Sequence, residues 1–174
     1  MTLELKPKRG GFQRPFRCGE FIRDFLMGLG PHGSVKINPE VGAPKATVFK
    51  QYKLALMRAM ALDLATRQEE KLARKENRRI DPDNIEKLAQ RYLDRIPYKS
   101  IACRYHSFVV YCSDLEKLGW IEFTGEIGHS AFQDHYREGN SRKYFRLTRA
   151  GIEAGEDAWK NPHRFLYPSK QASN

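Results

Sequence analysis

The sequence predicts a mainly helical α+β fold with a small antiparallel β-hairpin. Residues 45–77 contain neither proline nor glycine, which predicts one long helix. A capping aspartate and a proline, Asp81 and Pro82, mark the start of another helix. Apolar and polar residues then alternate over residues 120–124 and 143–147, a pattern typical of two short strands.

The length and composition indicate one principal domain. The chain has 174 residues, of which 40% are hydrophobic and 30% charged, within the range of globular proteins. It contains no run of about 20 apolar residues, which a membrane-spanning helix needs. The basic, polar N-terminus does not resemble a signal peptide. We therefore expect a cytoplasmic protein without a membrane partner.

The first 44 residues divide into two segments. Residues 1–15 combine prolines, a Gly-Gly pair and little apolar content, which predicts a flexible basic arm. The cations of this arm are Lys6, Lys8, Arg9 and Arg14. Residues 16–44 are predicted to form an amphipathic helix and a loop rich in proline and glycine. The apolar face of that helix consists of Phe21, Ile22, Phe25, Leu26 and Leu29.

The predicted long helix of residues 45–77 changes character along its length. Its first half is apolar around most of its circumference, so it is expected to be buried on more than one side. Such burial places it either at the centre of the domain or at a subunit interface, and a homodimer through helix 45–77 is one possible assembly. Its second half is mostly charged and is expected to project from the surface.

Two further helices follow, separated by a short turn. The helix that begins at Pro82 is stopped by Pro97. The next helix is predicted over residues 100–118, because Gly119 can supply a left-handed C-terminal cap. Its core stripe consists of Ile101, Tyr105, Phe108, Cys112, Leu115 and Leu118.

The C-terminal third contains the hairpin and a closing helix. In the first strand Ile121 and Phe123 are expected to face inward, and in the return strand Phe145 and Leu147. Thr148 is expected to cap a final helix. In that helix Ile152, Gly155 and Trp159 share one face, and Asn161-Pro162 ends it. Residues 161–174 are assigned to a C-terminal tail.

Two phrases in this region carry a family resemblance. "SDLEKLGWIEF" ends the helix predicted over residues 100–118, and "YFRLTRAGIEA" takes the return strand into the final helix. In this respect the chain resembles the winged helix-turn-helix superfamily, over about residues 80–159. The resemblance implies a winged helix domain of residues 45–160 with a long first helix, preceded by an N-terminal helical extension. Residues 125–143 would form the wing, whose tip is longer than usual.

The resemblance implies a DNA-binding protein that regulates transcription. In that architecture the second helix of the turn motif enters the major groove of duplex DNA and the wing contacts the backbone. Arg104 is the residue expected to contact a base, because a guanidinium can bond guanine at two points. The full predicted DNA-binding set is Lys99, Ser100, Arg104, His106, Ser107, Arg137, Arg142 and Lys143.

The charge distribution favours a polyanionic partner. The net charge is +10, and residues 1–60 alone hold 11 basic and 4 acidic side chains. A cationic N-terminal arm attracts nucleic acid first and an anionic membrane second. The alternative is that the charge serves only to keep the protein soluble.

Two other functions stay open at this point. Val109 and Val110 lie off the main core stripe, and an exposed apolar pair is unusual on a surface built for DNA. The wing also carries Glu126, Asp134 and Glu138, which would repel phosphate. A protein-interaction winged helix in a nucleic-acid-processing assembly is therefore one alternative. The other is binding of RNA or single strands by the arm and the aromatic residues of the wing.

The sequence offers no pattern typical of an enzyme. It contains no glycine-rich phosphate loop and no nucleophile elbow. His129 and His135 lack both a nearby cysteine pair and the i, i+4 spacing of a helical zinc site. We therefore expect no catalytic residues, no metal and no cofactor.

Overall fold

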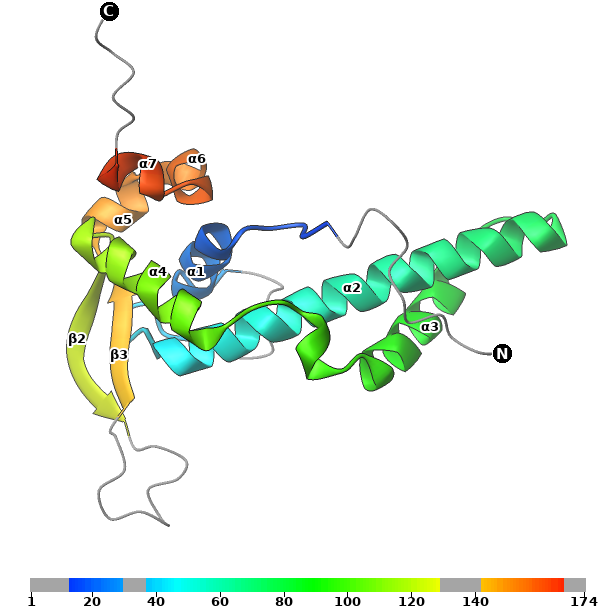
Figure 1. The fold of residues 1–174 in the computed structure, drawn as a ribbon, viewed down its shortest axis with the longest axis horizontal. Coiled ribbons are helices and arrows are strands. Elements are labelled where there is room, and N and C mark those ends of the chain that lie inside the picture. The colour runs from blue at the N-terminus through cyan, green and yellow to red at the C-terminus, as the bar shows by residue number, and fades with distance from the viewer. Residues whose placement is uncertain (1–12, 30–36, 129–141, 168–174) are drawn as a thin grey trace, which may run out of the picture. The chain divides into compact units, whose positions relative to one another are not determined.

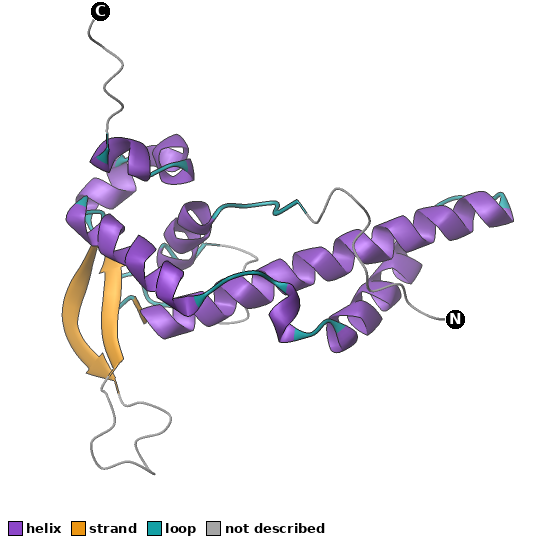
Figure 2. Ribbon diagram, in the orientation of Figure 1, coloured by secondary structure: helices purple, strands orange, loops and turns teal. Residues whose placement is uncertain are grey.

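A computed structural model describes residues 13–29, 37–128 and 142–167, with only the backbone described for residues 126–128 and 142. The fold is mainly helical, as the predicted α+β class requires, and its small antiparallel sheet has three strands where a two-stranded hairpin was predicted (Figures 1 and 2). The described residues divide into two compact units. Unit 1 contains residues 13–15 and 53–102, and unit 2 contains residues 16–52 and 103–167 with the gaps given above.

Helix α2 (Lys45–Glu76) confirms the long helix predicted over residues 45–77. It begins in unit 2 and ends in unit 1. In unit 1 it is followed by α3 (Pro82–Arg95) and by a short 3₁₀ helix, η1 (Tyr98–Ser100). The predicted cap of α3 is confirmed, because the side chain of Asp81 accepts a hydrogen bond of 3.0 Å from the backbone N–H of Asp83.

Unit 1 is a helical hairpin in which α3 runs beside the second half of α2 (Figure 1). On α2, four residues at four-residue spacing are buried, which is the repeat of one helical face. They are Ala61, Ala65, Glu69 and Ala73. On α3, Leu88 and Tyr92 are buried in the same way. Small residues on α2 therefore leave room for larger side chains from α3.

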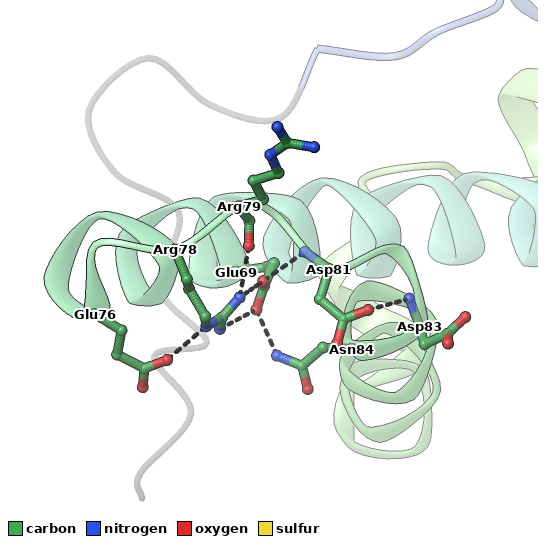
Figure 3. Close-up of polar contacts among 7 residues, drawn as sticks. All are labelled: Glu69, Glu76, Arg78, Arg79, Asp81, Asp83 and Asn84. Carbon is green, nitrogen blue, oxygen red and sulfur yellow. Dashed lines mark hydrogen bonds and ion pairs between the residues drawn. The ribbon is translucent and has the colours of Figure 1, made fainter.

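A buried carboxylate joins the two arms of this hairpin (Figure 3). The side chain of Glu69 has no exposed surface, and it accepts hydrogen bonds from the guanidinium of Arg78 and from the Asn84 amide. It also accepts one of 2.8 Å from the backbone N–H of Asp81, the residue that caps α3. The pKa of Glu69 is lowered to about 2, first by Arg78 and then by Asp81 and Asn84. In its ionised form, the carboxylate of Glu69 therefore holds the turn between α2 and α3 in place.

The sheet lies in unit 2. It consists of β1 (Ala43–Pro44), β2 (Ile121–Gly128) and β3 (Arg142–Leu147), in the order β1-β3-β2 with both pairs antiparallel. Ile121 is paired with Leu147 and Phe123 with Phe145. Three of these four are buried as predicted, but Phe123 is 44% exposed, so its expected inward position is wrong. A register shift begins directly after Phe123, where β2 departs from regular pairing.

Unit 2 also contains helices. They are α1 (Cys18–Leu26), the start of α2, α4 (Tyr105–Lys117), α5 (Arg149–Glu153), α6 (Gly155–Lys160) and α7 (His163–Leu166). The largest side chains without exposed surface come from several of these helices and form the core of the unit. They include Phe21, Ile22, Leu26, Tyr52, Leu115 and Trp159. The predicted apolar face of α1 is confirmed except for Leu29, which is 50% exposed because α1 ends at Leu26.

Two predicted joints are confirmed. Gly119 has a φ of 73°, and Trp120 N–H donates back to the Leu115 carbonyl across 3.0 Å, which closes α4 with a left-handed cap. The hydroxyl of Thr148 accepts a hydrogen bond of 3.0 Å from the N–H of Gly151, so Thr148 caps α5. The same hydroxyl donates to the carbonyl of Gly119. One threonine therefore connects the end of the hairpin to its beginning.

The predicted closing helix is divided in two. It breaks between α5 and α6, where Gly155 has a φ of 76° in the left-handed region. Because of this break Ile152 is 49% exposed and does not share the buried face of Trp159. The indole N–H of Trp159 instead donates to the carbonyl of Gly151 across 2.8 Å.

The start of the helix predicted over residues 100–118 is wrong. Helix α4 begins at Tyr105, and residues 98–100 form η1 instead. Ile101 and Arg104 both have extended backbone conformations, and Ile101 is buried. The boundary between the two units falls between Ala102 and Cys103, inside this extended segment. The spacing of Ile101, Tyr105 and Phe108 resembles the apolar stripe of one helix. In the structure, however, Ile101 is buried in unit 1 and Phe108 in unit 2.

Among the described residues, no helix is both long and apolar enough to cross a membrane.

Candidate nucleic-acid interface

The outward face of α4 is set by its buried face. Phe108, Cys112 and Leu115 are buried at spacings of four and three, so the opposite side of the helix is left outward. Its exposed residues at and near the N-terminal end are Arg104, Tyr105, His106, Ser107 and Val110. The ring of Tyr105 packs edge-on against Phe49, with 5.3 Å between the ring centres, which ties the first turn of α4 to α2.

The N-terminal end of α4 is electropositive for two reasons. Its first turn contains no acidic residue, and Arg104 and His106 lie there on the surface. The helix dipole adds partial positive charge at the same end. In the part of the chain that the structure describes, no ion pair or hydrogen bond engages the side chain of Arg104 or His106. Both side chains are thus available to an anionic ligand.

The carboxylates of α4 lie toward its other end and are paired. Asp114 is 3.4 Å from the Nδ1 of His163 and 3.8 Å from the Nζ of Lys117. Glu116 pairs with Lys45 at the start of α2. These pairs reduce the repulsion that the carboxylates would exert on phosphate. The helix therefore presents the Arg104 cation at its N-terminal end and paired acids near its C-terminal end.

The hairpin of β2 and β3 contributes a further cation. Lys143 on β3 is exposed, and its Nζ lies 5.6 Å from the centre of the Phe123 ring on β2. Arg146, three residues further along β3, makes different contacts. It pairs with Glu122 at 2.9 Å and donates to the carbonyl of Glu40 at 3.1 Å, so it fastens the sheet to the segment before β1.

The predicted DNA-binding residues do not all fall in one unit. Arg104, His106 and Ser107 are brought together at the start of α4 in unit 2, which also holds Arg142 and Lys143 on β3. Lys99 and Ser100 belong to η1 in unit 1, so their assignment to the N-terminal end of the same helix is wrong. The reason is the extended segment of residues 101–104 that separates η1 from α4. Arg137 lies outside the described residues.

Of the predicted basic arm, the structure describes only Arg14. Its guanidinium donates a hydrogen bond of 2.8 Å to the carbonyl of Ala102, within unit 1. Lys6, Lys8 and Arg9 lie outside the described residues.

One structural feature of the surface was not foreseen from the sequence. It is the pairing of Asp114 and Glu116, whose partners are far away along the chain in His163 and Lys45. Only a pattern of unlike charges on separate predicted helices could have signalled it. The apolar pair expected to be exposed is so in part: Val110 is 49% exposed, whereas Val109 is half-buried.

The described residues offer little that indicates chemistry on a small substrate. A hollow of about 90 Å³ is lined by Glu20, Arg23, Asp24, Glu156 and Trp159. It is smaller than the ~300 Å³ at which ligand pockets begin, and Arg23 pairs with both Asp24 and Glu156. Burial raises the pKa of Cys112 to about 12, which keeps this thiol protonated. Within the described ranges no three His, Cys, Asp or Glu side chains are grouped to hold a metal ion, and His129 and His135 lie outside those ranges.

Comparisons with protein-family models, with curated proteins and with solved structures found no match for this chain.

Proposed function

We propose that the chain is a winged helix DNA-binding protein that contacts duplex DNA with α4 and with the wing between β2 and β3. The observation that carries this proposal is the N-terminal end of α4. There Arg104 and His106 are exposed, the first turn holds no acid, and the acids further along the helix are paired. A guanidinium in this position suits base readout, and the dipole of the helix suits phosphate.

The topology of unit 2 supports a winged helix in a different arrangement from the predicted one. Its elements follow the order α1, β1, start of α2, α4, β2, β3, and β3 lies between the other two strands. This order and this strand arrangement are typical of the winged helix superfamily. We therefore propose that α1 is the first helix of the motif, the start of α2 the second, and α4 the recognition helix. The hairpin of unit 1 is then an insertion between the second and third helices.

The division of labour follows from the charges. Arg104 reads a base edge, His106 and Ser107 bond phosphate or base, and Lys143 neutralises backbone charge at the base of the wing. A transcriptional regulator is the class of protein that we propose, since sequence readout by a helix is its defining task. A homodimer through helix 45–77 stays a prediction. Such a dimer would read two half-sites of the duplex.

A protein-interaction winged helix is the second candidate. It is favoured by the exposure of Tyr105 at 47%, Val110 at 49% and Phe123 at 44%, because exposed apolar side chains are common at protein interfaces. One pair of variants distinguishes the two candidate functions. V110E should abolish capture of a protein partner in a pull-down, and R104Q should leave that capture unchanged.

A bandshift titration at two salt concentrations tests the proposed function. The wild-type protein should bind duplex DNA at low salt and lose affinity as salt rises, because cations displace counterions from the backbone. R104Q should bind the preferred duplex about tenfold more weakly, the scale of one lost two-point base contact. R149Q is the matched control, because Arg149 is 91% exposed in the same unit and pairs with Glu153 of its own helix. Absence of duplex binding by the wild type at low salt would overturn the proposal.

A further inference from the structure

The second half of α2 carries a row of cations on one side. They are Arg67, Lys71, Arg74 and Lys75, all exposed, and we call them the basic face. At 100° per residue these four positions fall within about 100° of the helix circumference, and they span about 12 Å along its axis. The row belongs to unit 1, whereas the helix proposed for base readout belongs to unit 2.

The basic face lies opposite the side of α2 that packs in the hairpin. The buried positions Ala65, Glu69 and Ala73 centre about 180° from Arg67, Lys71 and Arg74 around the helix. The hairpin therefore holds the four cations outward. Because Glu69 bonds the turn and α3, the orientation of this part of α2 is fixed within unit 1.

Of the four cations of this face, the carboxylates of the same segment pair only with Arg67 in the described structure. Glu69 and Glu76 both bond to Arg78, and Asp63 pairs with Arg67 at 3.1 Å at the start of the row. Glu70 borders the face beside Arg74 without an ion pair in the described structure. No hydrogen bond or ion pair among the described residues engages the side chain of Lys71, Arg74 or Lys75.

Stability of the helix accounts for only part of the row. Arg74 and Lys75 lie in the last turn, where cations favour the helix dipole. Lys71 lies more than one turn from the C-terminal end at Glu76, where that effect has faded. Its charge gains nothing from the dipole and is open to a ligand.

We propose that the basic face binds the phosphate backbone of duplex nucleic acid, independently of base sequence. Lys and Arg side chains gathered along one helical face are an arrangement that displaces counterions from a row of phosphates. This proposal rests on the proposed function, because the duplex that the basic face binds is taken to be the one that α4 reads. The insertion then adds non-specific affinity to a recognition helix in the other unit.

The test compares two double variants of the full-length protein in salt titrations with duplex DNA. K71Q/R74Q removes one Lys and one Arg from the basic face. K87Q/R91Q removes the same two residue types from the exposed side of α3, where Asp83 and Asp94 lie among them. Equal melting curves by circular dichroism establish that both variants fold. R104Q on α4 serves as the third arm.

K71Q/R74Q should weaken binding to specific and non-specific duplexes by the same factor, and should reduce the slope of log K against log salt by about 1 to 2. K87Q/R91Q should change neither. Wild-type affinity and slope in K71Q/R74Q, or an equal loss in both double variants, would overturn the inference and leave R104Q to decide the proposed function. Loss in K71Q/R74Q with none in R104Q would support the inference and overturn the assignment of α4. Tighter binding to phosphatidylserine vesicles than to duplex DNA would also overturn the inference.

Discussion

The carboxylate of Glu69 and the guanidinium of Arg78 form an ion pair in which Glu69 has no exposed surface and Arg78 remains one-third exposed. Two nitrogens of Arg78 bond the two oxygens of Glu69, and its Nε bonds Glu76 (Figure 3). The pair links α2 to the turn before α3. It therefore determines the geometry of the hairpin that carries the basic face.

The substitution E69Q is expected to destabilise unit 1, because it leaves Arg78 without its buried partner and puts an N–H₂ group among donors. We expect a fall in melting temperature by calorimetry. E76Q is the matched control, since Glu76 is 54% exposed and bonds Arg78 from the solvent side. A melting temperature for E69Q equal to that of E76Q would show that the buried carboxylate is not needed.

The lowered pKa of Glu69 predicts that the folded state loses stability in acid. Its folded-state pKa of about 2 lies below the ordinary value of 4.5, so the folded state binds fewer protons than the unfolded state between those values. The stability that Glu69 contributes is therefore full above about pH 4.5, and it is lost as the pH falls through about 2. Urea unfolding measured across this pH range should show a shallower acid decline in E69Q. An unchanged pH dependence would contradict the lowered pKa.

Thr148 is expected to stabilise the joint between the hairpin and α5 through its hydroxyl. T148A should lose about 1 kcal/mol of unfolding free energy, because the N–H of Gly151 and the carbonyl of Gly119 each lose a side-chain partner. T148S keeps the hydroxyl and should recover most of the loss. Chemical denaturation measures both variants, and equal losses in the two would exclude a role for the hydroxyl.

Gly151 is required by the close approach of α5 to Trp120, the residue before β2. A Cβ added there would lie 2.2 Å from the carbonyl oxygen of Trp120, and that backbone atom cannot move as a flexible side chain would. We expect G151A to cost about 1 to 3 kcal/mol of unfolding free energy, as overpacking does. Ala150 is exposed in the same helix, and A150S should stay within about 0.5 kcal/mol of wild type. Similar stabilities of the two variants would contradict the close approach.

Local rules predicted the joints of this fold well. Asp81, Gly119 and Thr148 act on backbone groups within a few residues, so their capping roles can be read from sequence alone. The start of α4 was missed because residues 101–104 hold no proline or glycine to mark a break, whereas the boundary between the two units falls within this segment. Strand β1 has two residues in a loop rich in proline and glycine, and it exists through pairing with β3.

The candidate site was predicted in part. Arg104, His106 and Ser107 were placed on the exposed side of the helix that became α4 from periodicity, which is a local property. Lys99 was misplaced with the helix start, because its position depends on the same long-range packing. Glu69 gave no signal that separates it from Glu70, except that it continues the four-residue spacing of Ala61, Ala65 and Ala73. The partners that allow a carboxylate to be buried there lie 9 to 15 residues further along the chain, so local spacing does not reveal them.

The most direct test of the proposed contact is photo-crosslinking to labelled duplex DNA from a single position on α4. A photoreactive phenylalanine analogue replaces His106, which is exposed at the proposed interface, and in a second protein it replaces Ile152, which is 49% exposed on α5. Our account predicts a strong crosslink to the duplex from position 106 that salt abolishes, and little from position 152. Equal crosslinking from both positions, or none from position 106 at low salt, would contradict the account.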